Sequence, residues 1–161
     1  MTERTIVLEL ARIEGAHLTM LVRQFDELLA EDDVAGDPAL SRLVPDAYAD
    51  ADAAREFRSL TERDLLARRA DDAAVVLASL AAIGELSDDP EDPRLVEVVE
   101  IPLDAVEVRA WLRTLSAVRL VLATRLGITD DDDHPQDDPR FGIYEWLGYR
   151  LDGLVRAIDG D

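Results

Sequence analysis

The chain has 161 residues, 48% of them hydrophobic and 5% aromatic, which suits one domain over residues 1–161 with a core of aliphatic side chains. Its 36 acidic and 17 basic residues give a formal net charge of −19, and every basic residue is an arginine. A charge this negative repels a phosphate backbone, so direct DNA binding is disfavoured. The absence of cysteine excludes disulfides, thiolate nucleophiles, cysteine zinc sites and thiol redox switches.

Membrane insertion is not expected from the distribution of apolar residues. The longest nearly continuous apolar run, residues 73–83, is shorter than the roughly 20 residues that a bilayer span needs. The first residues contain no apolar signal core. We therefore expect a cytoplasmic protein.

The first half of the chain predicts one strand and three helical segments. Residues 5–10 (TIVLEL) are β-branched and apolar and predict a short strand. Helical spacing of apolar residues then predicts a helix over residues 12–30. Residues 37–45 predict a short helix, because Asp37 stands at the cap and Pro38 at the first helical position. Residues 50–83 predict a long helical stretch, in which a capping-box pattern at residues 61–64 allows a break near residues 59–61.

The second half repeats the order of strand and helix. Residues 95–101 (LVEVVEI) predict a second strand, and Asp104 with Glu107 forms a capping box that starts a helix ending at Gly127. A last helix is predicted over residues 139–158. Glu14 and Glu107 occupy similar places after the two strands, which could pair as a small ribbon. We expect a mainly α fold, a bundle of four to six helices with two short strands.

No pattern in the sequence predicts catalysis, a metal site or a cofactor. The acidic run at residues 130–133 with His134 does not match a calcium loop, because Pro135 stands where that loop requires glycine. Neither a Gly-x-Ser-x-Gly elbow nor a phosphate-binding glycine loop is present. His17 is more simply explained as a residue of the helix surface or core edge. We therefore expect a protein that is not an enzyme.

The arginines and aromatic residues are the candidates for contacts. Two interpretations of the arginines stay open: an internal ion-pair network and a partner-binding surface. At least one of the two arginines in the apolar stretch 118–126 is expected to be partly buried, with a carboxylate from Glu56, Asp64 or Glu145 as its partner. The aromatic residues could be interface anchors or part of the core. The arginines are Arg55, Arg58, Arg63, Arg69, Arg109, Arg113, Arg119 and Arg125, and the aromatic residues are Trp111, Tyr144 and Trp146.

Three blocks of sequence carry a resemblance to a known family. They are residues 37–69 (DPALSRLVPDAYADADAAREFRSLTERDLLARR), 111–128 (WLRTLSAVRLVLATRLGI) and 144–158 (YEWLGYRLDGLVRAI). In order and spacing they resemble the AosR-like family of actinobacterial oxidative-stress transcriptional regulators, long catalogued as a domain of unknown function. The resemblance implies a sigma factor or RNA polymerase as partner. Separately, a homodimer stays open as an alternative.

Two functional hypotheses follow from this resemblance. The first is an oxidative-stress transcription regulator that acts by protein–protein contact and, lacking cysteine, without a thiol switch. The second is a non-enzymatic accessory or adaptor module of Clp proteolysis, since genes of the family commonly lie beside that of the Clp protease adaptor. A helical domain of unknown function is the remaining alternative.

Overall fold

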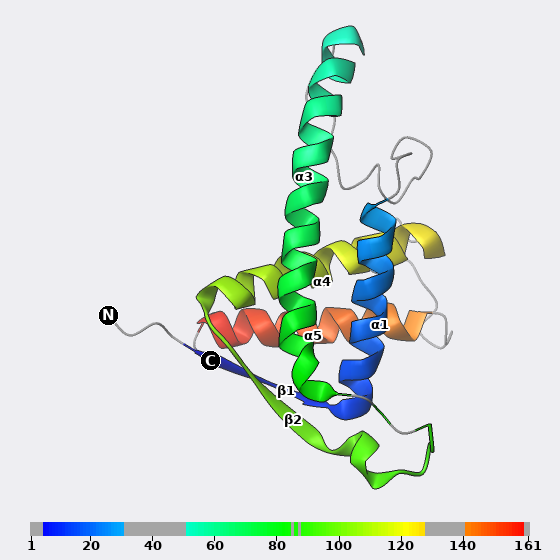
Figure 1. Ribbon diagram of the computed structural model, residues 1–161, viewed down its shortest axis with the longest axis vertical. Helices are drawn as coiled ribbons and strands as arrows, with labels where there is room; N and C mark the ends of the chain where they lie inside the picture. The colour runs from blue at the N-terminus through cyan, green and yellow to red at the C-terminus, as the bar shows by residue number, and fades with distance from the viewer. Residues whose placement is uncertain (1–4, 31–50, 85, 87, 128–140, 160–161) are drawn as a thin grey trace.

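The computed structural model describes residues 5–30, 51–84, 86, 88–127 and 141–159, with side chains from Arg63 onward in the second range. These residues form four α-helices and a two-stranded antiparallel sheet (Figure 1), which confirms the predicted mainly helical fold with a short ribbon. The predicted helix over residues 37–45 and the loop with His134 lie outside the described residues. None of the helices in the described part is both long and apolar enough to cross a membrane.

The ribbon joins the beginning of the chain to its middle. Strands β1 (Ile6–Ala11) and β2 (Val98–Leu103) pair antiparallel, with Ile6 opposite Leu103 and Ala11 opposite Val98. Alternate side chains point into the core or out to solvent, as the period of a strand requires. The second strand begins three residues later than predicted, because Pro93–Val96 forms a 3-10 turn, η2, capped by Asp92.

Each strand leads directly into a helix, and the two helices leave from opposite ends of the ribbon. Helix α1 (Arg12–Leu29) follows β1, and helix α4 (Ala105–Leu126) follows β2 after the cap residue Asp104. The predicted capping box of α4 is present: Asp104 N donates to Glu107 Oε1 at 3.1 Å, and Glu107 N donates to Asp104 Oδ1 at 2.8 Å. Gly127 ends α4 with a φ of 76°, a conformation that favours glycine.

Helix α3 (Ala51–Leu80) is the longest element, and the break allowed near residues 59–61 was wrong, because the helix is continuous there. The 61–64 pattern lies inside a helix whose backbone donors already have partners one turn earlier. Figure 1 shows the N-terminal part of α3 extending beyond the other helices. A 3-10 turn, η1 (Ala81–Ile83), ends this stretch before Gly84.

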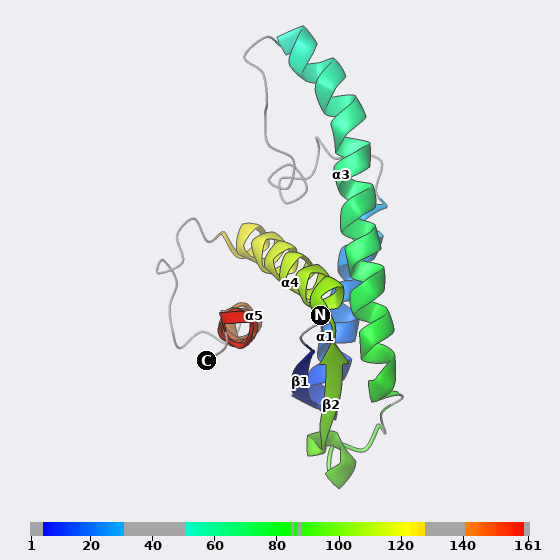
Figure 2. The same ribbon diagram turned by 90° about the vertical axis from the view of Figure 1, so that its left-hand side faces the viewer.

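Helix α5 (Gly142–Asp159) packs along α4, on the side turned away from α3 (Figure 2). The main core lies between the helices and the inner face of the ribbon. Its largest fully buried members are Trp111 of α4, Leu10 of β1, Leu18 of α1, Ile83 of η1 and Leu103 of β2.

At Gly15, α1 and the Ile83 side chain of η1 come close together. A Cβ atom at Gly15 would lie 2.6 Å from the Cδ1 and Cγ1 atoms of Ile83, whose side chain is buried in the core. On the same turn of α1, Arg12 Nη1 donates to the Ile83 carbonyl oxygen at 2.6 Å. The close approach and the hydrogen bond together hold η1 against the start of α1.

We expect Gly15→Ala to lower the free energy of unfolding by about 1–3 kcal/mol, since the added methyl overpacks a filled core. Gly153→Ala in α5 is the matched control, because a Cβ atom at Gly153 would have no neighbouring atom within 4 Å. That control should gain about 0.5–1 kcal/mol from reduced backbone entropy in the unfolded chain. Urea unfolding followed by circular dichroism measures both, and equal stability of the two variants would contradict the packing argument.

Candidate functional site

The arginines of α3 and α4 meet where these helices pack. Arg113 donates from Nε and Nη2 to the two carboxylate oxygens of Asp72 at 2.8 and 2.9 Å, a bidentate ion pair. The hydrogen bond to Asp72 raises the pKa of Arg113 above its ordinary, already high value. Arg69 of α3 donates to the Arg113 carbonyl oxygen at 3.4 Å. Arg69 and Arg113 therefore belong to a network that joins two helices.

Arg119 joins α4 to α5. Its guanidinium carbon lies 3.9 Å from the centroid of the Tyr144 ring, and its Nε donates to the Tyr144 carbonyl oxygen at 3.2 Å. Stacking of this kind suits the planar, weakly hydrated guanidinium. Gly148 leaves the space that Arg119 fills, because a Cβ there would lie 3.0 Å from Arg119 Nη2. Of the two arginines in the 118–126 stretch, Arg119 is the half-buried one and Arg125 is exposed.

The other predicted contact residues divide by exposure. Arg63 and Arg109 are exposed on α3 and α4, and the side chains of Arg55 and Arg58 lie outside the described residues. Trp111 is 1% exposed, so it belongs to the core and not to an accessible surface. Tyr144 is buried beneath Arg119, and Trp146 is half-buried. Within the described residues, no group of three or more His, Asp or Glu side chains could hold a metal ion.

Glu14, near the start of α1, connects three elements. Its Oε2 accepts from Trp146 Nε1 at 2.8 Å and from Arg150 Nη2 at 2.6 Å, both from α5. Its Oε1 accepts from the backbone N–H of Ala11 at 3.2 Å, which caps the helix. Arg150 Nη1 also donates to the Glu9 carbonyl oxygen of β1 at 3.2 Å. We call Glu14, Trp146 and Arg150 the Glu14 junction.

The Glu14 junction favours an ionised carboxylate. Burial raises the pKa of Glu14, but the hydrogen bonds from Arg150, Trp146 and the Ala11 amide outweigh it and leave the pKa below its ordinary value. A carboxyl with a lowered folded-state pKa stabilises the fold above its ordinary pKa. This stabilisation is lost as the pH falls through the folded-state value. Acid should therefore loosen α5 from α1 and β1.

An open groove lies between the C-terminal halves of α1 and α4. It has a volume of about 380 Å³ and is lined by six apolar side chains and three polar ones. The residues are Leu21, Gln24, Phe25, Glu27, Leu28, Val118, Val121, Leu122 and Arg125. We call it the α1–α4 groove.

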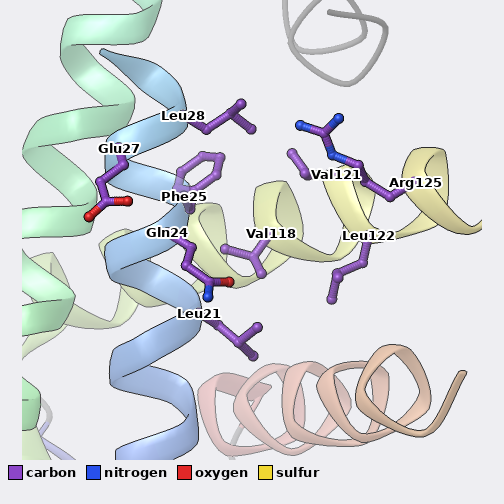
Figure 3. Close-up of a pocket in the computed structure, with 9 residues that line it drawn as sticks. All are labelled: Leu21, Gln24, Phe25, Glu27, Leu28, Val118, Val121, Leu122 and Arg125. Carbon is purple, nitrogen blue, oxygen red and sulfur yellow. The ribbon is translucent and has the colours of Figure 1, made fainter. Parts of the chain in front are cut away.

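Figure 3 shows how the α1–α4 groove is built. Phe25 and Leu28 of α1 face the α4 side chains, Val121 among them, and Arg125 carries its guanidinium at the rim. Glu27 points away from α4. Figure 2 shows the C-terminal end of α4 diverging from α1, which keeps the angle between the helices open.

Sequence reasoning placed Arg125 among the contact candidates but did not identify the groove. The periodic apolar residues of α1 and α4 are the same signal that predicts a core face, so the sequence did not show which of them would remain accessible. Arg150 was also not singled out. No local pattern in the sequence indicates the role of Arg150, because its partner Glu14 lies 136 positions away in the chain.

We expect Glu14→Gln to lower the free energy of unfolding by about 1–2 kcal/mol at neutral pH, because the amide removes the negative charge that strengthens the bonds from Arg150 and Trp146 and offers one acceptor oxygen instead of two. The difference from the unmodified protein should shrink as the pH is lowered through the ordinary carboxyl range toward the lower folded-state pKa of Glu14. Urea titrations at a series of pH values measure this.

Glu91→Gln is the control, since Glu91 is exposed in the turn before η2. It should lower stability little at any pH. A loss for Glu14→Gln that stays constant into the acid range would show that the charge of Glu14 is not what holds the junction.

Comparison with protein-family models matches residues 1–158 to a domain of unknown function (DUF2017). Comparison with curated proteins and with solved structures gives no match. The matched region includes every element described above, from the ribbon to α5. The chain therefore belongs to the DUF2017 family.

Proposed function

We propose that this protein regulates transcription in the oxidative-stress response through protein–protein contact, and that the α1–α4 groove is its docking site. The observation that carries the docking site is a concave apolar surface on a chain in which one residue in three is charged. Clefts lined mainly by apolar side chains with a few polar groups are common binding sites. The groove offers contact area and not reactive groups, which supports a non-enzymatic role.

The shape of the α1–α4 groove favours a helical partner segment. Two helices that diverge leave a channel into which an amphipathic helix can lay its apolar side chains, a common mode of peptide recognition. Leu21, Phe25 and Leu28 succeed one another along α1 at the spacing of helix turns. A partner helix with apolar residues at similar spacing would meet this row.

The net charge of the chain favours a cationic partner. The groove lies between the C-terminal halves of α1 and α4, where the helix dipole of α1 presents partial negative charge and that of α4 is offset by Arg125 in its last turn. The chain as a whole carries a formal net charge of −19, which attracts a basic segment at long range. The same charge disfavours unaided contact with DNA. The partner segment proposed is therefore an amphipathic helix with basic residues beside its apolar face.

The biological role rests on the resemblance of residues 37–69, 111–128 and 144–158 to the AosR-like regulators. That resemblance supports a sigma factor or a subunit of RNA polymerase as the source of the partner segment. In a chain without cysteine, the response cannot pass through a thiol pair. The Clp-linked adaptor is the second hypothesis, and a pull-down from stressed cells separates the two.

We expect Val121→Asp to reduce recovery of a sigma factor or polymerase subunit about tenfold, in cross-linked pull-downs from peroxide-treated cells. Replacing a central apolar contact typically costs about 1–2 kcal/mol of binding, and about 1.4 kcal/mol corresponds to tenfold. Val96→Asp is the control, because Val96 is 72% exposed in η2, away from the groove, and adds the same charge. It should leave recovery unchanged.

If Val121→Asp reduces folding, seen as a lower melting temperature, the milder pair Val121→Thr and Val96→Thr replaces it. Equal recovery with both members of a pair would contradict the docking site. Recovery of Clp components without sigma factor or polymerase would favour the adaptor. Tight, salt-sensitive binding of bare duplex DNA by the isolated protein would contradict both.

A further inference from the structure

A second cavity lies between α1 and α5, next to the Glu14 junction, and we call it the α1–α5 cavity. It has a volume of about 360 Å³ and is mainly apolar. Its walls come from the first three turns of α1 and the first two turns of α5: Glu14, His17, Met20, Leu21, Gly142, Ile143 and Trp146. Trp146 thus belongs both to this cavity and to the junction that fastens α5 to α1.

Met20 contributes a thioether sulfur to this cavity, which the other lining residues lack. The chain has two methionines and no cysteine, and Met20 is the sulfur-containing residue within the described ranges. Its side chain is 53% exposed, so an oxidant in solution can reach the thioether. Met20 also lines a larger depression between α1 and the end of α3. Met20 is therefore accessible to solvent both from the α1–α5 cavity and from the depression beside α3.

We propose that Met20 is a site of reversible oxidation, and that its sulfoxide weakens the attachment of α5 to α1. A lone pair of the thioether sulfur attacks the distal oxygen of a hydroperoxide and the O–O bond breaks. The sulfur gains one oxygen atom and is oxidised by two electrons. The remaining peroxide oxygen is reduced and leaves as an alcohol, or as water from hydrogen peroxide, after taking up the proton. Methionine sulfoxide reductases reverse the change.

The effect on structure follows from the walls of the cavity. The thioether is apolar and suits Ile143 and Leu21, whereas a sulfoxide oxygen needs a hydrogen-bond donor. The indole N–H of Trp146 already donates to Glu14, so the sulfoxide needs water or exposed donors of α1 such as His17 and Arg23. Water drawn into the cavity raises the local dielectric and weakens the contact between Glu14 and Arg150.

As a signal, this modification rests on the proposed function, because it supplies an oxidant-sensitive element for a regulator that has no cysteine. The oxidation of Met20 itself, and its effect on α5, do not depend on the proposed function. Oxidation of Met20 and its effect on α5 can be measured on the isolated protein, without any partner. Failure of the docking experiment would leave these measurements standing, and failure here would leave the docking site standing.

The test uses the full chain, treated with hydrogen peroxide until peptide mapping by mass spectrometry shows one oxygen added at Met20. The chain has two tryptophans. Trp111 is 1% exposed in the core, so fluorescence changes at the α1–α5 cavity are assigned to Trp146. We expect the emission to shift to longer wavelength and the melting temperature to fall by about 2–4 °C. Treatment with methionine sulfoxide reductases should reverse both changes.

Three variants give the controls. Met20→Leu keeps an apolar side chain and removes the sulfur, so it should not respond to the oxidant. Met20→Gln places a polar group at the same position and should reproduce part of the fluorescence shift without oxidant. Trp146→Phe should remove the shift while its Met20 is still oxidised. The proposal is overturned if the oxidised protein keeps the emission and melting temperature of the reduced one, or if Met20→Leu responds equally.

Discussion

The contact of α5 with α1 and β1 centres on a single carboxylate at the start of α1, whereas its contact with α4 is made by packing and by Arg119. Glu14 accepts hydrogen bonds from Trp146 and Arg150 of α5 and from the backbone at the end of β1. Arg150 extends the connection to the outer edge of β1. A charge of this kind is costly to bury without partners, so the groups that satisfy Glu14 are fixed in position. The α1–α5 cavity lies beside these contacts, and Glu14 and Trp146 belong both to the junction and to the cavity wall.

The ribbon determines where the α1–α4 groove lies, because it sets the starting points and directions of α1 and α4. Because β1 and β2 are antiparallel and each leads directly into a helix, α1 and α4 start from opposite ends of the ribbon. They pack where they cross and diverge toward their C-terminal ends (Figures 1 and 2). Apolar residues continue along both helices beyond the crossing. The groove is therefore a consequence of strand order and helix length, and not of a dedicated loop.

Most of the fold could be predicted from the sequence, because its signals are local. The caps at Asp104 and Gly127 and the helical spacing of α1 identify elements by interactions within a few residues. The continuity of α3 was not predictable in this way, since a capping-box pattern also occurs inside helices. The sites depend on contacts between distant positions, as with Arg113 and Asp72 or Arg150 and Glu14. Apolar periodicity could not distinguish Leu28 at a groove from Leu18 in the core.

The contacts of the arginines show how this acidic, lysine-free protein uses its cations inside the fold. Arg113 joins α4 to α3, Arg119 joins α4 to α5, and Arg150 joins α5 to α1 and β1. The guanidinium suits this role because its planar donors can meet a carboxylate, a carbonyl and an aromatic face together. Cations engaged in this way are not available to neutralise phosphates. In the described part of the chain, these three arginines thus hold the helices together, whereas Arg63, Arg109 and Arg125 are exposed.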